Sequence, residues 1–135
     1  MLVRIGGVFV RSIKTYHILL NNETGVPKPG KFVEMKNSLT EIKKIVGENI
    51  EPIYLTDKIV ALVDEDGKFK KLPDNSYLYR NGTIADIIVG NIVCVKIEDG
   101  NFVSLDEADE EIIEKIIPRI NRSQRVHKEE RLGDR

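Results

Sequence analysis

The chain has 135 residues, of which 41% are hydrophobic and 32% charged, with a formal net charge of -1. A chain of this length fits one domain, because a second hydrophobic core would have too few residues to form. The balance of apolar and charged residues excludes a wholly disordered chain, and the small net charge argues against a general polyanion-binding protein. The lone cysteine, Cys94, indicates a reducing compartment, and no stretch reaches the roughly 20 apolar residues of a membrane span. We therefore expect a cytoplasmic protein with no membrane association.

Charge is distributed unevenly along the chain. Residues 118–135 contain five arginines and one lysine against three acidic residues, a net charge of +3, which leaves -4 for residues 1–117. The last stretch is polar and follows a proline, so we predict one domain over residues 1–117 and a basic, flexible tail over residues 118–135. Such a tail could contact nucleic acid.

Alternating apolar residues predict several strands in the first third of the chain. Two short strands are expected within residues 1–13, around a turn or bulge at Gly6-Gly7. Residues 15–20 are rich in β-formers, and residues 31–35 resume the alternation after a loop that contains two prolines and two glycines. The pattern indicates strand, loop, strand.

A capping box predicts a helix that starts at Ser38. The serine oxygen can accept from the Glu41 amide while the Glu41 carboxylate reaches back to the serine amide. Gly47 is suited to end the helix, because glycine tolerates the left-handed conformation. The apolar residues that follow recur at helical spacing on one face: Leu39, Ile42, Ile45 and Val46.

Strand signals return at residues 50–55 and 58–63. Pro52 cannot donate to a ladder, so its strand is predicted to be an edge or to start after the proline. The acidic segment Asp64–Gly67 is predicted to form a turn into a further strand at residues 68–72.

The β-branched run Ile87–Ile97 predicts a long buried strand at the centre of the sheet, with Gly90 at a bulge or close backbone approach. Asp99-Gly100 is a hairpin signal, because both positions of a type I′ turn need positive φ. The chain should return through residues 102–105.

A second capping box, Ser104 with Glu107, predicts a final helix that ends before Pro118. The elements together predict an α+β fold, a single twisted, mostly antiparallel or mixed sheet of about five to seven strands with two helices packed on it. The apolar positions of the final helix keep helical spacing: Leu105, Ala108, Ile112, Ile113, Ile116 and Ile117.

Several segments resemble, in the same order, an uncharacterised family of domains of unknown function associated with bacteriophages and mobile elements. The resemblance covers roughly residues 15–117 and implies a fold and a phage-like setting, but no catalytic residue. Glu48 and Asp64 depart from the glycine and asparagine expected there. The matching segments are Leu39–Glu51 (L-x-x-I/L-x-x-x-V-G-x-x-I-E), Glu65–Lys68 (E-x-G-K), Leu72–Asn75 (L-P-x-N), Asp86–Gly90 (D-I-I-V-G) and Phe102–Leu105 (F-V-S-L).

The usual catalytic side chains are scarce. His17 and His127 are the only histidines, neither has a companion nearby in the sequence, and Cys94 lies within an apolar run, so structural or solvated roles are expected for all three. The segment that starts at Asp64 does not match a calcium loop, because its twelfth position is Asn75. We expect no metal, no cofactor and no catalytic residue.

One constellation points to a ligand. In an extended segment two tyrosines two residues apart share a face and can stack on a base, while neighbouring cations bind phosphates. The alternative is an amphipathic hairpin whose tyrosines cover the core edge and whose lysines lie in water. The candidate ligand-binding residues are Lys68, Lys70, Lys71, Tyr77, Tyr79 and Arg80.

These observations favour a non-enzymatic accessory protein of a phage or mobile element that antagonises host defence by binding. Its partner would be a nucleotide signal, which it sequesters, or a host defence protein, which it blocks. The alternative is a nucleic-acid-binding module that uses the lysine-rich hairpin and the arginine tail. A hydrolase acting through Asp64, Asp66 and Asp86 is a third hypothesis. A homodimer is compatible with an edge strand and a small core.

Overall fold

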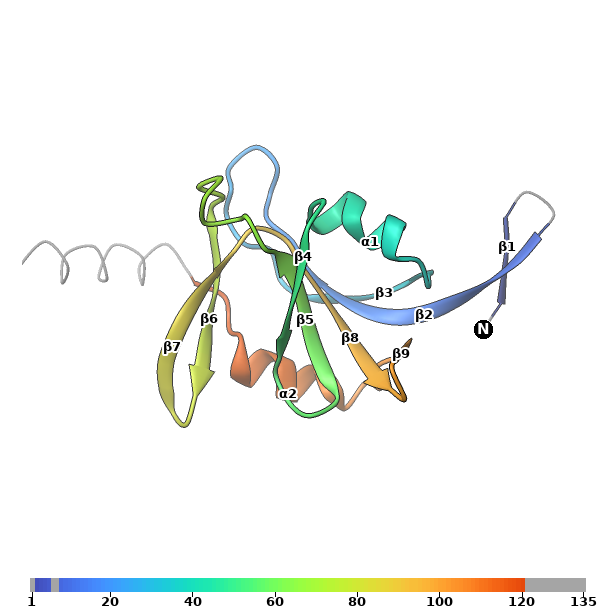
Figure 1. Ribbon diagram of the computed structural model, residues 1–135. Coiled ribbons are helices and arrows are strands. Elements are labelled where there is room, and N and C mark those ends of the chain that lie inside the picture. The colour runs from blue at the N-terminus through green and yellow to red at the C-terminus, as the bar shows by residue number, and fades with distance from the viewer. Residues whose placement is uncertain (1, 6–7, 121–135) are drawn as a thin grey trace, which may run out of the picture.

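The structure, a computed structural model, describes residues 2–5 and 8–120, with side chains from Arg11 onward (Figure 1). Its strands are β1 (Leu2–Ile5), β2 (Val8–Ile18), β3 (Lys31–Lys36), β4 (Ile50–Tyr54), β5 (Ile59–Asp64), β6 (Asp74–Arg80), β7 (Thr83–Val89), β8 (Ile92–Glu98) and β9 (Asn101–Val103). Its helices are α1 (Leu39–Val46) and α2 (Asp109–Ile116).

Seven of these strands form one sheet in the order β1-β2-β8-β5-β4, with β3 paired to β2 and β9 paired to β8. Every pairing is antiparallel. The α+β class, the mostly antiparallel sheet and the two helices are therefore confirmed. The remaining strands, β6 and β7, form a separate two-stranded sheet.

The two helices cover opposite faces of the large sheet (Figure 1). Side chains alternate between the faces of a strand, so the buried strand β5 serves both helices. Ile59, Ala61 and Val63 belong to a core cluster with α2, and Val60 and Leu62 belong to a cluster with α1. We refer to these sides as the α2 face and the α1 face. The β6–β7 hairpin adds Leu78 and Ile88 to the core of the α2 face, where α2 contributes Ile113 and Ile117.

The predicted start of α1 is confirmed. The Ser38 hydroxyl accepts from the Glu41 amide at 3.4 Å. The reciprocal bond of the capping box does not form, because the Ser38 amide donates to the Lys36 carbonyl at 2.9 Å; the Glu41 carboxylate pairs with Lys44 Nζ at 3.0 Å. Gly47 ends the helix with φ of 143°, a value that residues other than glycine rarely adopt.

The turn predicted at Asp99-Gly100 and the position of Pro52 are also confirmed. Asp99 and Gly100 have φ of 50° and 77°, and they join β8 to β9. Pro52 lies in β4, which is an edge strand of the large sheet. In place of two strands within residues 8–20, the chain forms the single strand β2, which ends at Ile18.

The strand predicted at residues 68–72 is wrong. After β5 the chain makes successive turns, in which the Lys70 amide donates to Asp66 and the Leu72 amide donates to Gly67. The long strand predicted over residues 87–97 is two strands, because Gly90 has φ of 78° and turns the chain between β7 and β8. The second of these, β8, does lie between β2 and β5 as a central strand.

The second predicted capping box is also wrong. The Ser104 hydroxyl accepts from the backbone amide of Lys14 at 2.9 Å and so joins two segments of the sheet. Helix α2 begins only at Asp109, whose carboxylate accepts from the Asp106 amide at 2.7 Å. At the start of α2, the Asp109 carboxylate therefore accepts from a backbone amide, the role that was predicted for the Ser104 hydroxyl.

Residues 118–120 run along β6. The Tyr77 amide donates to Pro118, and the Ile120 amide donates to Asn75, at 3.0 and 2.9 Å. Ile120 is buried. The rest of the predicted tail, His127 included, lies outside the described residues.

Candidate functional site

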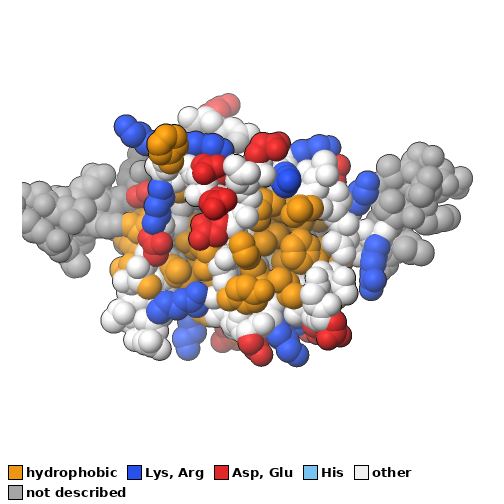
Figure 2. Space-filling model, viewed as in Figure 1, with side chains coloured by type: hydrophobic (Ala, Val, Ile, Leu, Met, Phe, Trp, Pro, Cys, Tyr) orange, Lys and Arg blue, Asp and Glu red, His pale blue; other side chains and the backbone are white. Residues whose placement is uncertain are grey.

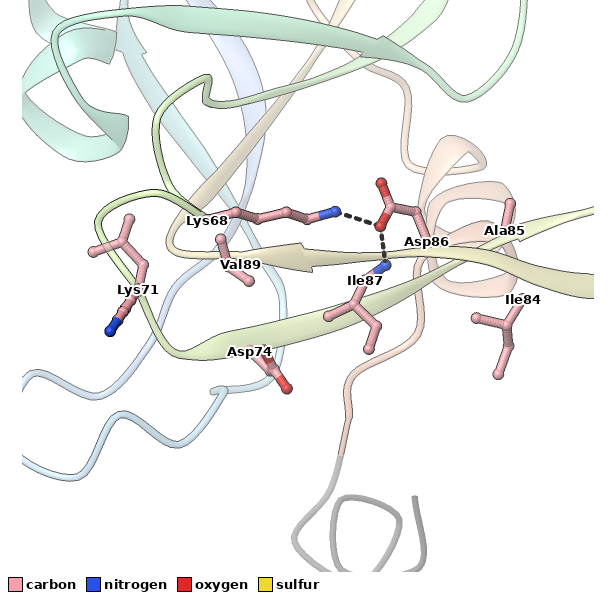
Figure 3. A pocket seen from close by; sticks show the side chains of 9 residues that line it. Lys68, Lys71, Asp74, Ile84, Ala85, Asp86, Ile87 and Val89 are labelled. Carbon is pink, nitrogen blue, oxygen red and sulfur yellow. Dashed lines mark hydrogen bonds and ion pairs between the residues drawn. The ribbon is translucent and has the colours of Figure 1, made fainter. Parts of the chain in front are cut away.

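A hollow of about 600 Å³ lies between the turns that follow β5 and the strand β7 (Figure 3). Its apolar lining includes Ile84, which is 51% exposed. Its charged lining comes from both segments and from the start of β6. The complete lining is Lys68, Lys71, Leu72, Asp74, Ile84, Ala85, Asp86, Ile87 and Val89.

The turns beside the hollow are anchored at Asp64, the last residue of β5. Its side chain is only 3% exposed, and it accepts from Lys70 Nζ at 2.8 Å and from the Asp66 amide at 2.8 Å. The Asp66 carboxylate in turn accepts from the Asn49 side chain at 2.9 Å. These bonds fix the loop that carries Lys68 and so position the wall of the hollow.

Gly90 lets the two walls approach closely. Its amide donates to the Pro73 carbonyl at 2.9 Å. A Cβ at this position would lie 2.8 Å from Leu72 Cδ1, which is closer than carbon atoms pack. A side chain here would therefore displace Leu72 from the hollow.

Two basic and two acidic groups surround the apolar floor. Lys68 and Asp86 point toward each other with Nζ and Oδ1 2.5 Å apart on one side of β7, and in the view of Figure 3 Lys71 and Asp74 lie on the other side of this strand, where Ile87 also points. Lys71 has φ of 58°, a conformation in which residues other than glycine are uncommon. It makes no ion pair with any residue that the structure describes.

The structure divides the six predicted ligand-binding residues among several places. Lys68 and Lys71 line the hollow. Lys70 is turned to the other side of the loop, where the hydrogen bond from its ammonium to Asp64 raises the pKa of the lysine. The lysines thus do not form one patch on a hairpin.

The tyrosines and the arginine are not part of the hollow. Tyr77 is 7% exposed and lies edge to face with the half-buried Tyr79, with ring centroids 6.3 Å apart. Arg80 donates from Nη2 to the carbonyl of Tyr54, which ties the hairpin to the edge strand β4. Two tyrosines in edge-to-face contact do not offer a pair of parallel surfaces for a base.

A family described as a domain of unknown function (DUF3846) matches residues 17–117. The chain belongs to this family. The match includes every residue that lines the hollow and both helices, and it begins after the β2 core residues Ile13 and Tyr16. Neither the curated proteins nor the solved structures contain a match to this chain.

The His17 and Cys94 side chains lie in the core of the protein. His17 is 5% exposed on β2, and burial, with Lys31 nearby, lowers its pKa to about 4. Cys94 is fully buried on β8, and burial raises its pKa to about 12. Both side chains therefore belong to the packed interior, where the imidazole is neutral and the thiol is protonated.

The three aspartates of the hydrolase hypothesis are each engaged by a protein donor. Asp64 binds Lys70, Asp66 binds Asn49, and Asp86 binds Lys68. Within residues 2–5 and 8–120, no cluster of three or more His, Cys, Asp or Glu side chains is arranged to hold a metal ion. In the same part of the chain, neither helix has the length and apolar character to cross a membrane.

Sequence reasoning missed the contribution of β7 to the hollow. Asn81 and Gly82 have φ of 52° and 77° and form the turn between β6 and β7. An Asn-Gly pair is a strong hairpin signal, and no turn was predicted at this position. Recognising it would have placed Ile84 and Asp86 on a strand paired with β6.

Proposed function

We propose that this protein is a binding protein that holds a nucleotide in the hollow beside β7. The observation that supports the proposal is an apolar floor of binding-site dimensions with charged side chains at its rim. Small-molecule sites are concave, lined mostly by apolar side chains, and carry a few polar groups that orient the ligand.

Each part of a nucleotide finds a chemical counterpart in this hollow. A base can lie on the apolar surface of Ile84 and Ile87. The Lys71 ammonium supplies a positive charge for a phosphate. The carboxylates of Asp74 and Asp86 can accept hydrogen bonds from sugar hydroxyls or a base amino group.

The charge of the site limits the number of phosphates. Lys68 and Lys71 are balanced by Asp74 and Asp86, and Lys68 is already paired with Asp86. A highly charged triphosphate would meet the two carboxylates without enough compensating cations. We therefore propose a ligand with one or two phosphates, such as a mononucleotide, a cyclic nucleotide or an ADP-ribose-type compound.

In a phage or mobile-element setting, a protein that holds such a compound would lower the concentration of a nucleotide signal of host defence. Binding alone is sufficient for this role, and no turnover is required. The protein would act in the cytoplasm, where such signals are produced.

Isothermal titration against a panel of these nucleotides tests the proposal. We expect Lys71→Ala to weaken binding by about tenfold or more, the loss expected when a hydrogen bond to a charged group is removed. Ile84→Asp should abolish binding without unfolding the protein, because this side chain is 51% exposed. Lys58→Ala, at an exposed lysine of the β4–β5 turn, is the matched control and should leave affinity unchanged.

Two outcomes would contradict the proposal. One is the absence of heat with every nucleotide of the panel. The other is binding that survives Lys71→Ala and Ile84→Asp but is lost with Tyr79→Ala. That result would locate the binding site at Tyr77 and Tyr79.

A further inference from the structure

The α1 face of the large sheet is only partly covered, because α1 has eight residues. Beside the helix lies a second hollow of about 400 Å³. Figure 2 shows apolar side chains gathered over β4, β5 and β8 at this place. The apolar residues that line it are Leu39, Ile50, Pro52, Tyr54, Leu62, Ile97 and Phe102. We refer to these seven residues as the apolar face.

Two members of the apolar face are unusually exposed for their size. Leu39 is 50% exposed at the start of α1, and Tyr54 is 49% exposed at the end of β4. Leu62, by contrast, is 2% exposed and lies deep in the hollow. A contiguous apolar surface with protruding side chains is the usual mark of an interaction site.

The neighbouring edge of β4 is not suited to accept another strand. The Glu65 amide donates to the Asn49 carbonyl, so by antiparallel alternation the backbone groups of Ile50, Pro52 and Tyr54 point away from β5. Pro52 has no N–H to donate, and the Tyr54 carbonyl already accepts from Arg80. A partner must therefore pack on the side chains of the apolar face.

The apolar face has the features of a surface that fits a second copy of itself. It combines protruding side chains and a hollow on one side of the molecule. Its rim carries Lys43 together with Glu48 and Glu65, so both charges are present. A two-fold axis brings the same patch of two copies together, so a patch that carries both charges at its rim can pair Lys43 of one copy with an acidic residue of the other.

We propose that the apolar face is the interface of a symmetric homodimer. Tyr54 and Leu39 of each copy enter the hollow of the other, and Lys43 of each copy lies near Glu48 or Glu65 of the other. The interface buries the side chains that the short helix leaves exposed. The nucleotide hollow beside β7 is lined by none of these residues, so the dimer does not depend on the proposed function.

Sedimentation equilibrium over a range of concentrations tests the dimer. Wild type should be dimeric, and Leu39→Glu and Tyr54→Glu should each weaken dimerisation by about 30-fold or more, as for a central apolar anchor. Ile112→Glu is the control, because Ile112 is a 40% exposed residue of α2, which covers the opposite face. Circular dichroism of each variant establishes that the fold persists.

Exchanging the charges at the rim of the apolar face distinguishes a second copy of the chain from an unrelated partner. Lys43→Glu alone should weaken the dimer, and so should Glu48→Lys with Glu65→Lys. An equimolar mixture of the two should form a heterodimer, because each interface then regains opposite charges. A wild type that stays monomeric at its highest soluble concentration overturns the proposal. So does a dimer that tolerates Leu39→Glu and Tyr54→Glu.

Discussion

The α2 face and the α1 face belong to the same sheet, but they are closed to different degrees. On the α2 face, the Tyr16 hydroxyl donates to Glu114 at 2.6 Å, and Arg119 connects Glu114 to Ser76. On the α1 face, the Nε2 atom of the buried His17 has no hydrogen-bond partner among the residues that the structure describes. One face has its polar groups joined in a network, and the other keeps apolar side chains exposed. We infer that stability is concentrated on the α2 face and that the α1 face is available for contact.

The network on the α2 face joins three elements that are distant in sequence. Tyr16 lies on β2, Glu114 on α2 and Ser76 on β6. Burial, followed by the hydrogen bond to Glu114, raises the pKa of Tyr16 above its usual value. The Tyr16 phenol therefore stays protonated and donates to Glu114. Through Arg119, the same network joins the β6–β7 hairpin to α2.

The largest effect is expected from a cavity on the α2 face. Ile113→Ala removes a fully buried side chain of α2 and should lower the free energy of unfolding by about 4 kcal/mol. Ile112→Ala, at the 40% exposed neighbouring position, should cost about 1 kcal/mol or less. Urea denaturation of both variants measures the difference. Equal losses would show that α2 is not the main stabilising contact of the sheet.

The two faces also differ in how well the sequence predicted them. The helical spacing of Ile113 and Ile117 and the β-branched run around Val93 identified the core correctly. Burial of apolar side chains leaves a periodic signal, and this signal does not depend on distant contacts. The same reasoning predicted that Cys94 is buried, and it is.

The candidate site could not be predicted in the same way. Lys68 and Asp86 meet through folding of separate segments, and no local pattern reports that contact. Lys70 was expected beside Lys68, but the partner that turns it away is Asp64, the last residue of a preceding strand. Gly90 was correctly marked as a special position, but its turn divides a run that periodicity alone makes continuous.

Acid should destabilise the protein through the α1 face. Burial lowers the pKa of His17 to about 4 from the usual 6.5. Above pH 6.5 the imidazole is neutral in both states. As the pH falls toward 4, the unfolded chain binds a proton that the folded chain does not, so the free energy of unfolding falls by up to about 3 kcal/mol.

The His17→Leu variant isolates this contribution. The difference between wild type and variant should be constant above pH 6.5 and should change only as the pH falls below that value. At pH 7 the variant should be equally or more stable, because the leucine leaves no buried nitrogen without a partner. Denaturation curves at several pH values measure both effects. A difference that does not vary with pH would show that water reaches the imidazole.

A smaller effect is expected at the end of α1. Gly47 has φ of 143°, and a Cβ there would lie 2.5 Å from Asp64 Oδ2. Gly47→Ala should cost about 2 to 3 kcal/mol, from backbone strain together with displacement of a buried carboxylate. Gly100→Ala is the control, because Gly100 has φ of 77° and no atom of the described part of the chain lies within 4 Å of its Cβ position. Its cost should be about 1 kcal/mol, from strain alone.

The smallest effect is expected from Leu39→Ser on the apolar face. The side chain is 50% exposed, so at low protein concentration its loss should change the free energy of unfolding by no more than about 0.5 kcal/mol. At high concentration the loss should grow, because association of folded chains stabilises the wild type by mass action. Thermal unfolding at several concentrations measures both quantities. A loss of several kcal/mol at every concentration would mean that the α1 face is as closed as the α2 face, and the contrast between them would not hold.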